Sequence, residues 1–185
     1  MKNLLKEILS TSVYLLIVLL ITYLFVQYVG QRTEVVGSSM ESTLQDGDNL
    51  LVDKLSYRFK EPERFDIIVF PYQYEEDTYY IKRIIGMPGE SIRIDTEGTI
   101  WVKKAQEEEF TILEEYYGKE IIHDPGQAIN EIVLDQDEYF VMGDNRNNST
   151  DSRSASVGNI HRRDILGKAF IRIWPLHKFE LLQHQ

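Results

Sequence analysis

The feature that most constrains this 185-residue chain is a stretch of 24 residues between Glu7 and Arg32 that carries no formal charge. Most of it is apolar. At about 1.5 Å per residue, such a stretch makes a helix long enough to cross the roughly 30 Å hydrocarbon core of a bilayer. It has no polar stripe to face water, which disfavours a buried core helix. We therefore predict a membrane-spanning helix over residues 9–30, preceded by a short cytoplasmic tail at residues 1–8.

A cleaved secretory signal is the competing interpretation, because Lys2 and Lys6 supply a basic start. The far end of the run, residues 28–32, lacks a pair of small residues spaced for cleavage, so we expect the helix to be retained. The basic N-terminus favours a cytoplasmic start and a domain on the outer side of the cytoplasmic membrane. Tyr14 and Tyr28 are expected near the two bilayer interfaces.

The remaining residues, 31–185, predict one mostly β domain. Short runs rich in β-branched and aromatic residues alternate with turns that contain glycine, aspartate or proline, which is typical of strands. The expected strands are residues 33–36, 49–53, 66–70, 79–85, 91–94, 99–102, 138–142, 165–169 and 170–173. The fold class that follows is an N-terminal transmembrane helix and a single extracytoplasmic β-rich domain.

Residues 103–137 break this pattern. They contain Glu107–Glu109 and further acidic residues without clear alternation. We interpret the segment as a solvated acidic insertion rather than a dedicated partner site, and its sequence indicates no function.

Composition narrows the possible partners. The net charge of −10 argues against nucleic acid, since proteins that bind a phosphate backbone concentrate Lys and Arg on one face. The chain has no cysteine, so disulfides and thiolate metal sites are excluded. Its four histidines are scattered without ligand spacing. We expect no metal and no cofactor.

Candidate chemistry begins at Ser39, which lies among small residues shortly after the apolar run. A serine hydroxyl is a weak nucleophile and needs a base, for which Lys82 is the best candidate. In a strand, Lys82 and Arg83 point to opposite faces, so the lysine can be dry while Arg83 reaches water or a carboxylate. Burial would lower the pKa of the lysine, as a general base requires. Without other information, Ser38 and Ser42 are rival hydroxyls, and Lys82 could be a solvated strand lysine.

Three stretches follow one another behind the apolar run, namely Gly37-Ser38-Ser39-Met40-Glu41-Ser42-Thr43-Leu44, Lys82-Arg83-Ile84-Ile85-Gly86-Met87-Pro88-Gly89-Glu90 and the loop Gly143 to Arg153. In these motifs and their order the chain resembles the bacterial type I signal peptidases. The resemblance covers most of residues 10–175 and is weakest between about 103 and 137. It implies a membrane-anchored Ser/Lys endopeptidase of the single-span form, with a β domain of the signal-peptidase type.

The resemblance also implies roles for individual residues. Ser39 would be the nucleophile and Lys82 the general base. Ser149 would hydrogen-bond the lysine amine, while Asp151 and Arg153 would hold the geometry of the site.

Substrates would be the signal peptides of exported preproteins, cut after small-x-small sites. By position in the motifs, Val35, Leu44 and Ile81 would line the shallow apolar pockets.

The chain departs from the family pattern at two positions. Gly37 stands where some members have a serine that helps to bind the oxyanion. The resemblance then implies only the Ser39 amide as an oxyanion donor. Ser42 stands where the family usually has proline, which would stiffen the bend by fixing φ.

Two other functions stay open from the sequence. A self-cleaving Ser/Lys protein of the SOS-repressor type shares the chemistry but calls for a DNA-binding N-terminus. A non-catalytic, membrane-anchored β domain that binds extracytoplasmic partners would not depend on Lys82.

Overall fold

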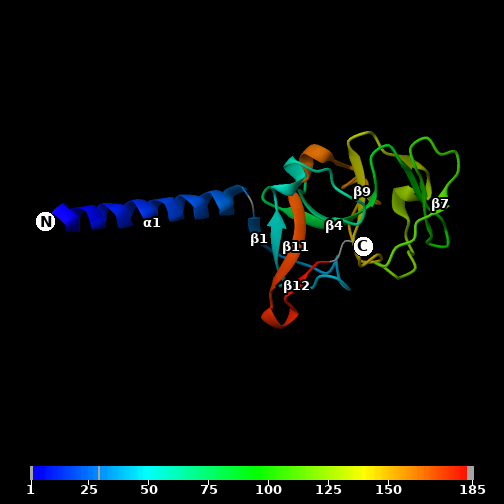
Figure 1. Cartoon of the computed structure of the whole chain (residues 1–185). Helices are drawn as coiled ribbons and strands as arrows, with labels where there is room; N and C mark the ends of the chain where they lie inside the picture. Colours follow the sequence, from blue (N-terminus) through cyan, green and yellow to red (C-terminus); the bar gives the residue numbers. More distant parts are fainter. Residues whose placement is uncertain (1, 29, 183–185) are drawn as a thin grey trace.

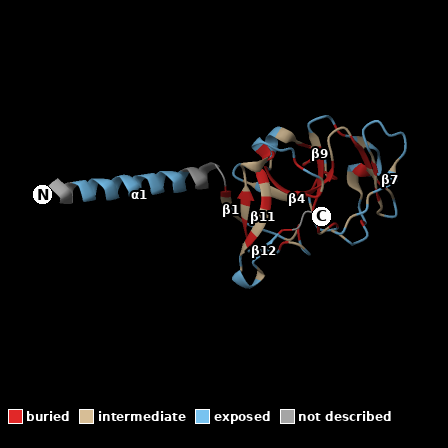
Figure 2. Cartoon of the chain, in the orientation of Figure 1, coloured by how far each residue is buried: buried red, intermediate tan, exposed pale blue. Residues whose placement is uncertain are grey.

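The computed structural model describes residues 2–28 and 30–182, and it separates a long helix from a β domain (Figure 1). Helix α1, Lys2–Tyr28, is about 40 Å long at 1.5 Å per residue, and its window Lys6–Tyr23 is apolar enough to cross a membrane. None of that window is buried (Figure 2). The helix starts earlier than the predicted span of 9–30, because residues 2–8 are mostly good helix formers. Gly30 already belongs to a strand, and the Tyr28 side chain lies outside the described residues.

The β domain is built on a large antiparallel sheet with strand order β1-β2-β11-β3-β4-β9-β10, to which β12 adds by pairing with β11. Its strands are β1 Gly30–Glu34, β2 Asn49–Asp53, β3 Ile67–Pro71, β4 Tyr79–Gly86, β9 Glu138–Met142, β10 Ile160–His161, β11 Gly167–Trp174 and β12 Glu180–Leu181.

A second, smaller sheet has the order β7-β6-β5-β8. It consists of β5 Ser91–Ile94, β6 Ile100–Lys103, β7 Thr111–Ile112 and β8 Ile132–Val133. The described residues also form four single-turn 3₁₀ helices, η1 Ser56–Arg58, η2 Gly126–Ile129, η3 Arg162–Asp164 and η4 Leu176–Lys178.

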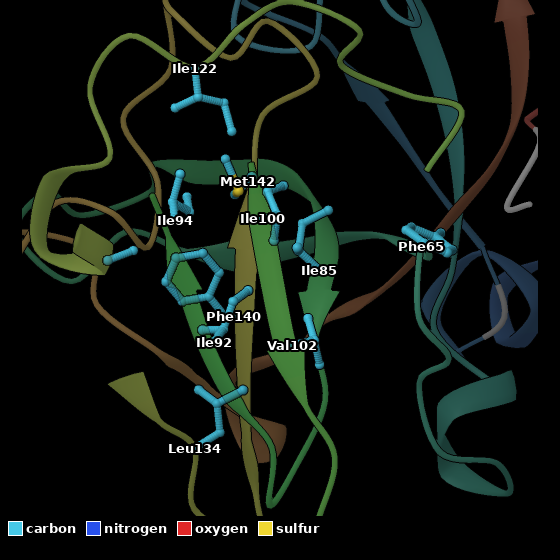
Figure 3. Close-up of a cluster of buried hydrophobic side chains, with 11 residues drawn as sticks. Phe65, Ile85, Ile92, Ile94, Ile100, Val102, Ile122, Leu134, Phe140 and Met142 are labelled. Atoms are coloured by element: carbon cyan, nitrogen blue, oxygen red, sulfur yellow. The ribbon is translucent and has the colours of Figure 1, made fainter. Parts of the chain in front are cut away.

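The core has three parts: the first lies between the two sheets, the second includes Ile68, Ile84 and Val141 of β3, β4 and β9, and the third lies under the segment that follows β1. Figure 3 shows the first part, where Ile92 and Val102 of the small sheet pack with Phe140 and Met142 of β9. A separate cluster gathers Val35, Met40 and Leu44 with residues of β2, β3 and β11, namely Leu50, Ile67 and Ala169. The loop that carries Ser39 is therefore fastened to the sheet by its own apolar side chains.

Most predicted strands are present, within one or two residues. The segments 49–53 and 138–142 match β2 and β9. The two strands expected at 165–169 and 170–173 are one strand, β11, which keeps its pairing with β2 across two register shifts. Such irregularities let a long strand continue through a bend.

The prediction of a solvated insertion at 103–137 is only partly right. Glu107–Glu109 are exposed, but Ile122, Ala128 and Leu134 are buried in the core. The segment also adds β7 and β8 to the small sheet. The segment places single, widely spaced apolar residues in the core, and such residues leave no periodic pattern in the sequence.

Candidate active site

Ser39 lies on a tight bend between β1 and β2. The amides of Thr43 and Leu44 both donate to the Met40 carbonyl, at 3.0 and 2.8 Å, and close the bend. Met40 and Leu44 are 1% and 0% exposed, so they anchor it to the core. The Ser39 hydroxyl is left half-buried at the surface of the sheet.

Lys82 of β4 meets this hydroxyl. Its Nζ lies 2.8 Å from Ser39 Oγ and donates a second hydrogen bond of 2.9 Å to the Ile81 carbonyl. The residue is 3% exposed. Burial lowers the pKa of the Lys82 amine from 10.5 to about 8, although the charges of Asp151 and Asp144 act in the opposite direction. A sizeable neutral fraction near neutral pH makes this amine able to take a proton.

Arg83 points to the opposite face, as strand alternation predicts, and it reaches a carboxylate rather than water. Its Nε and Nη2 donate to the two oxygens of Asp144, at 2.8 and 2.7 Å. The Thr43 hydroxyl donates to the same carboxylate at 2.5 Å. Both ion-pair side chains are fully buried. This paired and fully hydrogen-bonded arrangement ties β4 to the bend that carries Ser39.

The loop from Gly143 to Arg153 is fixed by a second ion pair. Arg153 donates to Asp151 through Nε at 2.8 Å and Nη2 at 2.9 Å, and the Gly143 amide donates to the same carboxylate at 3.0 Å. Gly143 lies so close to Ser39 that an added Cβ would be 2.3 Å from the Ser39 carbonyl oxygen. Asp151 and Arg153 thus pair within the loop that contacts Ser39, and their role in holding the geometry of the site stays a prediction.

Two asparagines of this loop, which were not among the predicted site residues, hydrogen-bond to Ser38 and Ser39. The Asn145 amide donates to the Ser39 carbonyl at 3.1 Å, and its side chain donates to the Ser38 carbonyl at 3.0 Å. Asn148 Nδ2 donates to Ser38 Oγ at 2.8 Å. The rival hydroxyl of Ser38 thus faces an amide and not the lysine. The run of asparagines in the loop was the available signal.

Ser149 does not hydrogen-bond Lys82 in this structure. Its hydroxyl is buried against Gly143 and has no hydrogen-bond partner among the described residues. The hydrogen bonds of the lysine amine go to Ser39 and Ile81 instead.

A cavity of about 570 Å³ opens onto the Ser39–Lys82 pair. One wall is residues 33–39 and the other is residues 77–82, so Val35 and Ile81 are among the residues that line the cavity. Leu44 does not, because it is fully buried in the core below the bend. The prediction that Leu44 lines the substrate pocket is therefore wrong, and Leu44 instead anchors the bend to the core.

The backbone at Ser42 differs from what a family-type proline would impose. Ser42 has φ of 84°, whereas proline is locked near −65°. Gly37, the other departure, has φ of 92° and no atom within 4 Å of an added Cβ. The bend is thus shaped by two left-handed residues, a conformation that costs serine more than glycine.

A serine hydroxyl bonded to a buried lysine amine, in an open groove, is the arrangement expected of a serine hydrolase that uses lysine as its base. Comparison with known proteins agrees. Residues 6–174 match the family described as signal peptidase, peptidase S26. A probable signal peptidase I-2 of Synechocystis sp. is 37% identical over 161 residues, covering 84% of this chain and 68% of the relative.

Signal peptidase I P of Bacillus subtilis subsp. natto is 34% identical over 181 residues, covering 95% of this chain and 92% of the relative. A crystal structure of a signal peptidase I from Enterococcus faecalis V583 aligns with a TM-score of 0.46 at 28% identity, covering 59% of this chain and 97% of that one. The chain belongs to the signal peptidase family, peptidase S26. It is a serine peptidase of the bacterial signal peptidase I type, and the activity of this class is the removal of signal peptides.

Proposed function

We propose that Ser39 and Lys82 form the catalytic dyad of this peptidase. The observation that carries the proposal is the 2.8 Å separation of Lys82 Nζ from Ser39 Oγ, with the lysine buried. The neutral amine takes the hydroxyl proton as Ser39 Oγ attacks the scissile carbonyl. Lys82 then protonates the leaving amine, and a water molecule hydrolyses the acyl-enzyme with the same base.

The Ser39 amide is proposed as the donor to the tetrahedral oxyanion. This amide has no acceptor among the backbone hydrogen bonds of the described residues, so it is available to a substrate oxygen. Gly37 contributes no hydroxyl there. Ser149 remains our candidate for orienting the lysine, since a buried hydroxyl without a partner can accept or donate a new hydrogen bond when the amine changes its protonation state.

The substrate is proposed to bind as an added strand. On one edge β4 pairs with β3 from Tyr79 to Arg83, but on the other edge its pairing with β9 starts only at Arg83. Residues 79–82 therefore keep a free edge that faces the cavity. Main-chain pairing accepts many sequences, and the apolar side chains of Val35 and Ile81 leave room for small residues before the cut.

The membrane arrangement is also a proposal. Residues 1–8 would be the cytoplasmic tail, residues 9–30 the span, and residues 31–185 a single extracytoplasmic catalytic domain. The exposed apolar surface of α1 supports the span, and the basic N-terminus supports the orientation. The bilayer would hold the active site close to membrane-inserted signal peptides.

The test uses the full-length protein in detergent with a preprotein and determines the N-terminus of the product. Wild type should cleave after a small-x-small site, and Ser39→Ala and Lys82→Met should each lose at least about 1,000-fold in kcat. Ser38→Ala, which removes the neighbouring hydroxyl, should cut at the same bond as wild type. Equal cleavage by wild type and both dyad variants would refute the dyad, and it would leave a non-catalytic β domain with a contaminating protease as the explanation.

A further inference from the structure

Residues 115–118, Glu-Tyr-Tyr-Gly, lie in the segment of the chain for which the sequence indicated no function, yet they contact two buried arginines of the active-site region. We name the three residues that make these contacts, Glu115, Tyr117 and Gly118, the strap. One arginine, Arg146, belongs to the loop behind Ser39, and the other, Arg83, is the neighbour of Lys82 on β4. The strap is not part of the wall of the Ser39–Lys82 cavity.

Glu115 makes the first contact. The two Nη atoms of Arg146 donate to its two carboxylate oxygens, at 2.5 and 2.7 Å. The Arg146 side chain is 1% exposed and that of Glu115 is 13% exposed. Burial raises the pKa of the Glu115 carboxyl, and the hydrogen bonds and charge of Arg146 oppose that rise. A bidentate pair of this kind fixes both position and orientation of the guanidinium.

Gly118 closes the strap on the same guanidinium. It has φ of 56°, and a Cβ added to it would be 2.2 Å from Arg146 Nε. No other residue type fits there without moving the arginine. The strap therefore contacts the Arg146 guanidinium with a carboxylate at its two Nη atoms and a glycine beside its Nε.

Tyr117 makes the second contact. The Arg83 guanidinium carbon lies 3.4 Å from the centre of the Tyr117 ring. A cation over an aromatic face is attracted to it, and more strongly when water is excluded. The Nε and Nη2 atoms of the same guanidinium donate to Asp144, so Arg83 contacts both the strap and the loop behind Ser39.

Both arginines lead directly to the reacting groups. Arg146 Nε donates to the Gly143 carbonyl at 3.0 Å. Gly143 in turn packs against the Ser39 carbonyl. The backbone amide of Asn145 donates to the same Ser39 carbonyl. Arg83 fixes the stretch of β4 from which Lys82 projects. A displaced guanidinium would thus change the separation of Ser39 Oγ and Lys82 Nζ.

We propose that the strap is a positioning element of the peptidase, in which Glu115 and Tyr117 hold Arg146 and Arg83 so that the serine and the lysine stay in register. The proposal rests on the Ser39–Lys82 dyad proposed above. Neither residue lines the Ser39–Lys82 cavity, so we expect the strap to act on the chemical step and not on binding.

The experiment measures kcat and KM for preprotein cleavage by the full-length protein in detergent, with rates normalised to the folded fraction from circular dichroism. Glu115→Gln and Tyr117→Leu should lower kcat on the order of 10- to 100-fold with KM within about twofold of wild type, because a displacement near 1 Å is enough for such a loss. The matched controls are the exposed neighbours, Glu114→Gln and Tyr116→Leu. They should keep the wild-type kcat.

A double variant sharpens the result. If Glu115 acts through Arg146, Glu115→Gln combined with Arg146→Gln should lose no more than the worse single variant, whereas independent effects would multiply. If Glu115→Gln does not fold, Glu115→Asp replaces it, since it keeps the charge and shortens the side chain by one methylene. A higher kcat in Glu115→Asp than in Glu115→Ala would support a positioning role for the carboxylate.

The outcomes separate the two proposals. Wild-type kcat in Glu115→Gln and Tyr117→Leu, with Ser39→Ala inactive, would overturn the strap and leave the dyad intact. A lower melting temperature with unchanged kcat per folded molecule would also overturn it, because that is a merely structural role. Activity in Ser39→Ala would instead overturn the dyad.

Discussion

Replacing Lys82 by methionine should make the protein more stable near neutral pH while abolishing activity. The pKa of the buried amine is about 8 when folded and has an ordinary value of 10.5, a difference of about 2.5 units. Each unit corresponds to about 1.4 kcal/mol, so keeping this lysine costs the folded state roughly 3 kcal/mol at low pH. The residue is 3% exposed, so water screens little of this cost.

The sign and the pH window follow from proton binding. Between pH 8 and 10.5 the unfolded chain binds the proton that the folded Lys82 has lost, so wild-type stability gains from this group as the pH rises. Below pH 8 both states are protonated, and the full cost is present. Methionine does not titrate. The stability advantage of Lys82→Met over wild type should therefore shrink by roughly 3 kcal/mol from pH 7 to 10.5.

Urea unfolding of the detergent-solubilised protein, followed by tryptophan fluorescence at several pH values, measures this change. The pH-dependent part is the decisive quantity, because the hydrogen bonds lost with the amine and the packing of the new side chain contribute about equally at every pH. Lys104→Met, at an exposed lysine, is the matched control and should show a flat difference. A flat difference for Lys82→Met as well would refute the burial argument.

Three further predictions concern the same site. The kcat/KM of wild type should rise about tenfold per pH unit below pH 8 and level off above it, because the neutral amine of Lys82 is the base that we propose; a profile flat from pH 6 to 9 would contradict this. Arg153→Met should move that profile to higher pH, since Asp151 would face Lys82 without its guanidinium partner. Ser42→Pro should lower the free energy of unfolding by more than about 1 kcal/mol in urea titrations, whereas Ser42→Gly should stay within about 1 kcal/mol of wild type, because only glycine suits φ of 84°. A proline variant as stable as wild type would show that the bend adopts another backbone.

The sequence predicted the elements that obey a regular pattern. Strand alternation predicted that Lys82 can be dry while Arg83, on the opposite side, reaches water or a carboxylate. In the structure Lys82 is buried and Arg83 pairs with Asp144. The choice of Ser39 over Ser38 depended on the resemblance to a family. In the structure only Ser39 faces the lysine, while the Ser38 hydroxyl accepts from Asn148.

Contacts between residues distant in the chain could not be predicted. Glu115 and Arg146 are 31 positions apart, and nothing in the acidic segment distinguishes Glu115 from its exposed neighbour Glu114. Leu44 reads equally well as a pocket or a core residue, because both environments favour leucine. The φ of Ser42 depends on how Met40 and Leu44 anchor the bend to the core. The conformational propensities of single residues carry no information on such anchoring.

The low pKa of Lys82 raises a physical question, because two carboxylates act on the amine and favour its charged form. Each of them is held by an arginine of its own, Asp144 by Arg83 and Asp151 by Arg153. A carboxylate and a guanidinium in bidentate contact largely cancel at a distance, so the field that reaches Lys82 is small and desolvation dominates. The ion pairs therefore serve two purposes at once. They fasten the strands and the loop around Ser39. They also limit how far the two nearby carboxylates raise the pKa of the Lys82 amine.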